Sequence, residues 1–142
     1  MTQPSSGTES LRVLQGMDIH EDQRKKTIVI YSPDLNFGFS LTMLLQDRYN
    51  VITTTNPGTL RSLAGDHDAD LVLMDAVPSG QIIERIDALK AQNKHMPVIL
   101  LYVFDQRSSD FDRKIRNHVD AVFYKPLDIS AVSARIQELL MQ

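Results

Sequence analysis

Five short apolar runs, each followed by a stretch with helical periodicity, most constrain what this 142-residue chain can fold into. The runs are nearly continuously apolar, which is typical of strands covered on both faces, as in a parallel sheet. They are Thr27 to Tyr31, Val51 to Thr54, Leu71 to Met74, Val98 to Val103 and Ala121 to Tyr124. Because parallel neighbours need crossover connections, this alternation predicts an α/β fold with helices on both faces of one sheet.

Three apolar stripes with helical spacing lie between or after these runs. Their members are Phe37, Leu41, Leu44 and Leu45, then Ile82, Ile83, Ile86 and Leu89, then Ile129, Val132, Ile136 and Leu139. Weaker helices are expected over Thr59 to Ala64 and after Gln106. The latter has Ser109 or Asp110 as its N-cap and Phe111, Ile115 and Val119 as its buried face. Five successive βα units predict a doubly wound, five-stranded parallel sheet in the order 2-1-3-4-5.

The first 26 residues differ from the rest in composition. They are rich in Ser, Gly, Gln and charge, and their apolar cluster is too short to build a core. Its members are Leu11, Val13, Leu14 and Met17. We expect a flexible arm over 1–26 and one domain over 27–142. A helix over Ser10 to Met17 would be marginal alone and would need something to dock against.

Composition excludes several classes of protein. No apolar run approaches the roughly 20 residues of a membrane-spanning helix, and no export signal begins the chain, so we expect a cytoplasmic protein. The absence of cysteine excludes disulfides and zinc–thiolate sites. A net charge of -3 with both signs interspersed argues against direct nucleic-acid binding. The basic cluster Arg107, Arg113, Lys114 and Arg116 is interpreted as a solvated helix face. The histidines His20, His67, His95 and His118 lack metal-ligand spacing and are expected to face solvent.

Polar residues at the predicted strand ends are the candidate site. In a doubly wound sheet, functional residues gather at the carboxyl ends of the strands, around the switch point between the first and third strands. Asp75 follows the third strand, Tyr102 closes the fourth and Lys125 follows the fifth, with Pro126 after it. The first strand is followed by Ser32, Pro33 and Asp34.

The aspartate at the third strand end, the Lys125-Pro126 pair at the fifth and the five βα units together resemble the receiver domain of response regulators, a CheY-like, flavodoxin-like fold. The resemblance covers roughly Thr27 to Leu140. It implies two-component signal transduction, in which a bacterial histidine kinase supplies a phosphoryl group to Asp75. It also implies a Mg²⁺ ion and a lysine, here Lys125, that neutralise the transferring group.

Four positions depart from the family pattern. The acidic pair that holds Mg²⁺ maps onto Ser32 and Pro33, so metal binding is expected to be weak. The nearest carboxylate, Asp34, falls one position later, which leaves Asp75 and Asp34 as the candidate metal ligands. Tyr102 stands at the site of the switch Ser or Thr, and Val122 at that of the switch aromatic residue. The loop after Asp75 is also shorter than in the family.

Three functions stay open. The first is an atypical pseudo-receiver, a signalling module and not an enzyme, in which Lys125 neutralises Asp75 permanently. Its partners would be a histidine kinase or other signalling protein, with a homodimer through the face of the fourth helix, fifth strand and fifth helix, and neither nucleic acid nor membrane. The second is a working phosphoacceptor that uses Asp75, Asp34 and Lys125.

The third is a flavin or nucleotide binder on the same fold. The first turn, residues 32–38, lacks the phosphate cradle of such sites. The chain ends at Gln142, soon after the last predicted helix, which is compatible with a stand-alone receiver and with a piece of a longer protein.

Overall fold

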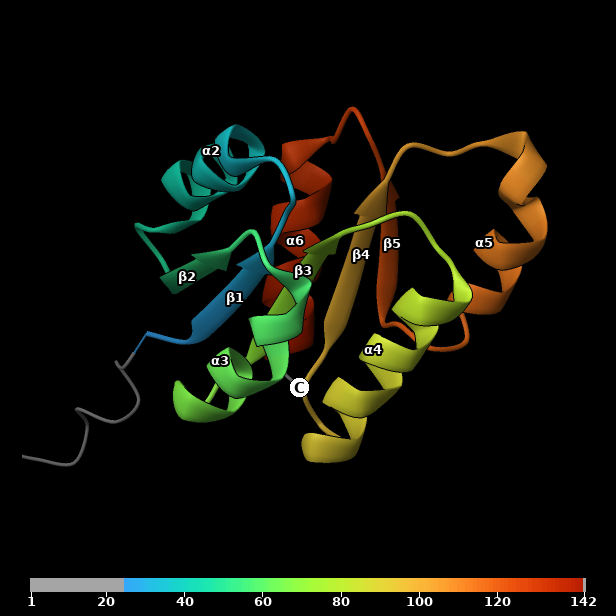
Figure 1. Ribbon diagram of the computed structural model, residues 1–142. Coiled ribbons are helices and arrows are strands. Elements are labelled where there is room, and N and C mark those ends of the chain that lie inside the picture. Colours follow the sequence, from blue (N-terminus) through green and yellow to red (C-terminus); the bar gives the residue numbers. More distant parts are fainter. Residues whose placement is uncertain (1–24, 142) are drawn as a thin grey trace, which may run out of the picture.

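The computed structural model describes residues 25–141, which form a five-stranded parallel sheet in the order β2-β1-β3-β4-β5 (Figure 1). The strands are β1 (Thr27–Tyr31), β2 (Asn50–Thr54), β3 (Leu71–Asp75), β4 (Val98–Tyr102) and β5 (Ala121–Tyr124). In register, Val29 lies opposite Val72 on β3, and Leu73 lies opposite Ile99 on β4. The strand order and the parallel pairing confirm the predicted doubly wound fold. The expected arm over 1–26 lies almost wholly outside the described residues.

Helices cover both faces of the sheet (Figure 1). On one face lie α2 (Leu35–Leu45) and α6 (Ile129–Leu140). On the other lie α3 (Leu60–Asp66), α4 (Gly80–Gln92) and α5 (Ser109–Ile115), with the short 3₁₀ turns η1 (Pro57–Thr59) and η2 (Gln106–Ser108) before α3 and α5. None of the helices over residues 25–141 is long and apolar enough to cross a membrane.

The burial of β3 on both faces explains why apolar and polar residues do not alternate in its sequence. Leu71 and Leu73 pack into the core under α2 and α6, whereas Val72 and Met74 pack into the core under α3, α4 and α5. Because both faces are covered, every residue of this strand is buried, and period-2 alternation is lost.

Side-chain caps start the three longest helices just beyond the carboxyl edge of the sheet. Asp34 caps α2, Ser79 caps α4 and Asp128 caps α6, each accepting hydrogen bonds from backbone N–H groups of the first turn. These caps fix where each strand-to-helix loop turns, and the loops that carry the candidate site are among them.

Two predicted buried positions are wrong. Leu44 on α2 is exposed, because Leu41 and Leu45 already fill the contact with the sheet. On α5, Phe111 is exposed and Asp112 is buried in its place. Neither Ser109 nor Asp110 caps that helix, since Ser108 occupies the N-cap position and makes no side-chain cap bond. The strand ends differ from the predicted ones by one residue at most.

Candidate functional site

Asp75 and Lys125 are in contact at the carboxyl edge of the sheet. Lys125 Nζ lies 2.7 Å from Asp75 Oδ1. Asp75 ends the central strand β3 and is 6% exposed, whereas Lys125 follows β5 and is held there by a backbone hydrogen bond of 2.8 Å to the Tyr102 carbonyl. The Lys125 ammonium also lies 4.5 Å from the ring centre of Phe37 on α2, a favourable cation–π distance.

The second oxygen of Asp75 is engaged by Ser32. The Ser32 hydroxyl donates to Asp75 Oδ2 at 2.7 Å and accepts from the Asp34 N–H at 3.0 Å. Ser32 is itself buried. Both oxygens of the Asp75 carboxylate therefore have partners, one cationic and one neutral.

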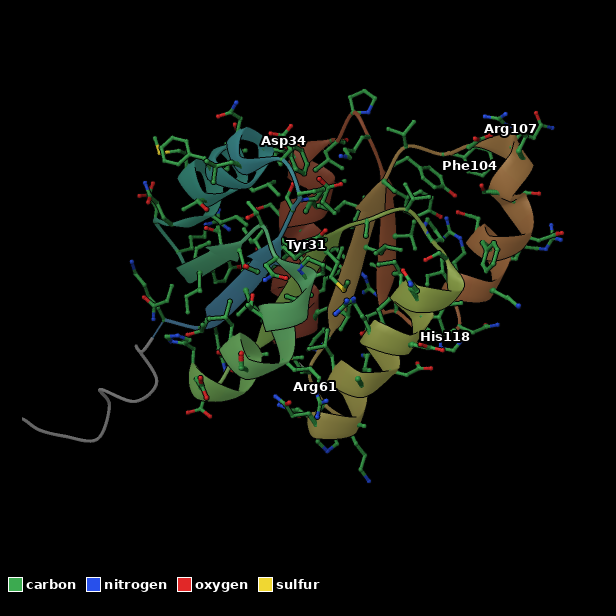
Figure 2. The ribbon with its side chains drawn as sticks, viewed as in Figure 1. Tyr31, Asp34, Arg61, Phe104, Arg107 and His118 are labelled. Atoms are coloured by element: carbon green, nitrogen blue, oxygen red, sulfur yellow. The ribbon has the colours of Figure 1, made fainter. Side chains whose placement is uncertain are left out.

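Asp34 does not join this group. Its Oδ1 accepts from the N–H groups of Asn36 and Phe37, at 3.0 and 3.3 Å, so the carboxylate serves as the cap of α2. Figure 2 shows Asp34 at the start of that helix. Pro33 is exposed and has no ligand atom in its side chain.

The residues present do not fit a Mg²⁺ ion. That ion needs a near-octahedral shell of hard oxygens, usually with more than one carboxylate. Here Asp75 supplies a single carboxylate, and a lysine ammonium lies on one of its oxygens. Within residues 25–141, no group of three or more His, Cys, Asp or Glu side chains is placed to hold a metal.

Tyr102 is directed to α5. Its hydroxyl donates to Asp112, its ring packs edge-on against Tyr124 with centroids 5.5 Å apart, and the Tyr124 hydroxyl donates to the same carboxylate at 2.8 Å. Arg116 completes the cluster, donating to the Tyr124 hydroxyl at 2.7 Å and to Asp112 at 3.4 Å. We call Tyr102, Asp112, Arg116 and Tyr124 the tyrosine–aspartate cluster.

Protonation states in this cluster follow from burial and hydrogen bonding. Burial and the hydrogen bond to Asp112 raise the pKa of the Tyr102 hydroxyl well above its ordinary value. Burial also opposes ionisation of Asp112, but the hydrogen bonds from Tyr102, Tyr124 and Arg116 outweigh it, and the pKa of that carboxyl lies below its ordinary value. At neutral pH the cluster thus holds a carboxylate acceptor and a phenol donor.

Sequence reasoning missed Asp112 and assigned Arg116 to a solvated face. The sequence does contain one indication of their contact, because Asp112 and Arg116 are four residues apart and residues at that spacing are neighbours on a helix. Arg107 and Arg113 are exposed to solvent, as predicted for this basic cluster, and form ion pairs with Asp105 and Asp110. Of the histidines in the described range, His67 and His95 are exposed, while His118 contacts Asp87 at 2.8 Å.

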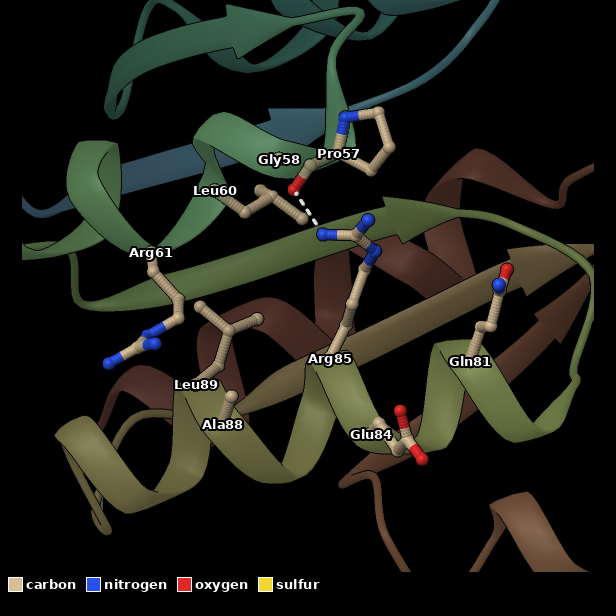
Figure 3. Close-up of a pocket in the computed structure, with 9 residues that line it drawn as sticks. All are labelled: Pro57, Gly58, Leu60, Arg61, Gln81, Glu84, Arg85, Ala88 and Leu89. Atoms are coloured by element: carbon tan, nitrogen blue, oxygen red, sulfur yellow. Dashed lines mark hydrogen bonds between the residues drawn. The ribbon is translucent and has the colours of Figure 1, made fainter.

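A separate hollow lies between α3 and α4 (Figure 3). It has a volume of about 370 Å³, and Leu60 and Leu89 line it together with Arg61 and Arg85. Arg85 is held across it by a hydrogen bond of 3.1 Å to the Pro57 carbonyl. None of the site residues predicted from the sequence lines this hollow.

Comparison with known proteins gives matches in structure alone. No protein-family model and no curated protein matches the sequence. A receiver domain of a two-component response regulator from Bacteroides fragilis aligns with a TM-score of 0.70 at 20% identity, over 84% of this chain and 99% of that one. A response regulator receiver modulated diguanylate cyclase from Pelobacter carbinolicus gives 0.68 at 24%, over 82% and 92%.

A structure from Burkholderia pseudomallei, described as a pilus assembly-related protein, also aligns. Its TM-score is 0.69 at 21% identity, over 84% of this chain and 92% of that one. At such identities the likeness establishes the fold, and it agrees with the observed strand order. The chain therefore has the flavodoxin-like fold of response-regulator receiver domains.

Proposed function

We propose that this chain is an atypical receiver domain of a two-component phosphorelay, a cytoplasmic signalling module that binds partner proteins and is not an enzyme. Its fold is that of receivers, and its sheet edge retains the aspartate and the lysine that the family pattern places there. In this proposal the domain signals without Mg²⁺-dependent phosphorylation.

The observation that carries the proposal is the occupied carboxylate of Asp75. To accept a phosphoryl group, one oxygen of Asp75 must attack phosphorus while nearby cations neutralise the charge of the transferring group. Here the lysine lies on one oxygen at 2.7 Å, the Ser32 hydroxyl lies on the other at 2.7 Å, and the residues present do not fit the metal ion. Both oxygens from which the attack on phosphorus would start are thus engaged by protein groups.

Intact-mass measurement after incubation with acetyl phosphate and Mg²⁺ tests this proposal. We expect the mass of the wild-type chain to stay unchanged, as it must for Asp75→Asn, while an active receiver in the same mixture gains one phosphoryl group. A Mg²⁺-dependent gain in the wild type that Asp75→Asn abolishes would overturn the proposal. It would support instead the second function, a phosphoacceptor at Asp75.

For its partners we propose a histidine kinase or another signalling protein, bound through the face of α5, β5 and α6. Exposed apolar side chains on the elements near β5 are Val103 and Phe104 after β4, Phe111 on α5 and Tyr124 on β5 itself. The rings of Phe104 and Tyr124 pack at 5.2 Å, and Figure 2 shows Phe104 on the connection from β4 to α5. Such a cluster is typical of a protein-binding surface.

A homodimer through this face is a proposal that sedimentation tests. We expect a concentration-dependent dimer for the wild type and a monomer for Phe104→Asp. The exposed Leu44 on α2, a helix outside this face, offers the matched control Leu44→Asp, which should dimerise like the wild type. A wild type that stays monomeric at all concentrations would contradict the homodimer and leave the face to other partners.

The flavin or nucleotide alternative finds less support. The hollow over the first turn, lined by Ser32, Asp34 and Thr54 among others, has a volume of about 300 Å³, at the lower end for ligand pockets. No aromatic side chain is among the described residues that line it.

A further inference from the structure

Helix α2 presents an apolar face to solvent. Leu35, Phe39 and Met43 follow one another at intervals of four residues, which places them in one stripe along the helix. They are 69%, 63% and 54% exposed. We call them the α2 stripe.

The composition of α2 makes this stripe unusual. A surface helix normally carries charged residues on the face away from the core. None of the residues from Leu35 to Leu45 is charged, so the solvent side offers the stripe beside Asn36, Ser40 and Leu44. Large exposed apolar patches mark binding sites, which indicates that something covers this helix.

The chain enters the described domain beside the end of the stripe. The Lys25 ammonium donates to the carbonyl of Gln46, the C-cap of α2, at 3.3 Å. The Gln46 side chain in turn contacts the sulfur of Met43 at 3.7 Å. Lys25, the first described residue, is therefore anchored at the Met43 end of the stripe.

An apolar segment lies within reach of that point. Leu11, Val13, Leu14 and Met17 fall on one side of a helical projection, with Arg12 on the other. Met17 is eight residues before Lys25, a tether of at most about 28 Å, whereas the stripe is about 12 Å long. The segment can thus reach the whole stripe.

We propose that residues 10–17 dock on the α2 stripe of their own chain. A helix this short is marginal alone, so the contact would supply the burial that it lacks. The stripe in turn would lose its exposure to water. Docking would cover the helix whose Phe37 contacts Lys125, and a partner that uses this face would have to displace the segment.

Paramagnetic relaxation in the full chain tests the docking. The sequence has no cysteine, so Arg12→Cys accepts a single spin label outside the apolar cluster. We expect the amide signals of Phe39 and Met43 to lose most of their intensity, while that of Glu84, on the opposite face of the sheet, keeps it. Leu14→Asp in the labelled chain should restore the α2 signals, and so should Phe39→Asp, whereas Met141→Asp should not.

Two results would overturn the proposal. In the first, the α2 signals stay weak in the Leu14→Asp variant, which would show that the spin label is near α2 only because the chain is tethered at Lys25. The other is loss of α2 signals when isotope-labelled chain is mixed with separate spin-labelled chain, which would make a second copy the occupant. Dispersed amide spectra of each variant verify that the domain is folded. The outcome does not depend on whether Asp75 is phosphorylated.

Discussion

Tyr102, at the carboxyl end of β4, donates its hydroxyl hydrogen to the buried carboxylate of Asp112 on α5. This bond joins β4, which lies between β3 and β5 in the sheet, to a helix of only seven residues. Since Tyr124 on β5 donates to the same carboxylate, one side chain of α5 is anchored to two strands. The position of α5 therefore depends on the tyrosine–aspartate cluster as well as on the packing of Ile115.

Removing the Tyr102 hydroxyl should destabilise the fold. In Tyr102→Phe the ring stays but the carboxylate loses a donor, and we expect the free energy of unfolding to fall by about 1–2 kcal/mol. Tyr49→Phe is the matched control, because Tyr49 is buried and its hydroxyl forms no hydrogen bond found within residues 25–141. Urea unfolding measures both, and equal losses in the two variants would contradict a special role for Tyr102.

Acid should weaken the same cluster. The pKa of Asp112 is lower in the folded chain than its ordinary value of about 3.9, so its contribution is complete above that pH and is lost as pH falls through the folded pKa. Asp112→Asn cannot lose a charge in this way. We expect the variant to be less stable than the wild type at neutral pH, with a gap that narrows below about pH 4. Urea unfolding across this pH range measures the difference in stability between the two proteins. A difference that does not change with pH would exclude the ionisation of Asp112 as its cause.

The sheet and the meeting of Asp75 with Lys125 were predictable for the same reason. Continuous apolar runs identify buried parallel strands, and the carboxyl ends of such strands converge at one edge. A residue placed at the end of β3 and another just after β5 are thereby brought to the same side of the sheet.

The role of Asp34 as the cap of α2 could be partly predicted from the sequence. Asp is among the preferred N-cap residues, and Asp34 stands three residues before Phe37, the first residue of the predicted stripe. The burial of Asp112 could not be predicted, because charged residues rarely face a core and the helical pattern favoured Phe111 as the buried residue. The buried carboxylate is stabilised there by the hydrogen bonds from Tyr102, Tyr124 and Arg116, of which the first two come from other elements of the fold.

An aspartate introduced at position 32 should make the stability of the domain depend on Mg²⁺. In Ser32→Asp a second carboxylate would replace the hydroxyl that now donates to Asp75, and the like charges should lower stability in chelator by about 1–2 kcal/mol. Mg²⁺ should recover part of this loss, because a ligand that binds the folded state stabilises it. Thermal unfolding with and without Mg²⁺ measures the effect. The wild type and Ser130→Asp, an exposed site in the first turn of α6, should not respond.

The strength of the Asp75–Lys125 contact can be isolated by a double-mutant cycle. Lys125→Met leaves the carboxylate, 6% exposed, with Ser32 alone, and we expect a loss of about 2–3 kcal/mol. Once Asp75→Asn has removed the charge, the same lysine substitution should cost far less, giving a coupling energy of about 1–2 kcal/mol. The exposed pair Arg135–Glu138, at 3.0 Å, should give about 0.5 kcal/mol or less in a parallel cycle. A coupling as small as that of the exposed pair would mean that Lys125 does not hold Asp75, and the proposal of a permanently neutralised site would lose its physical basis.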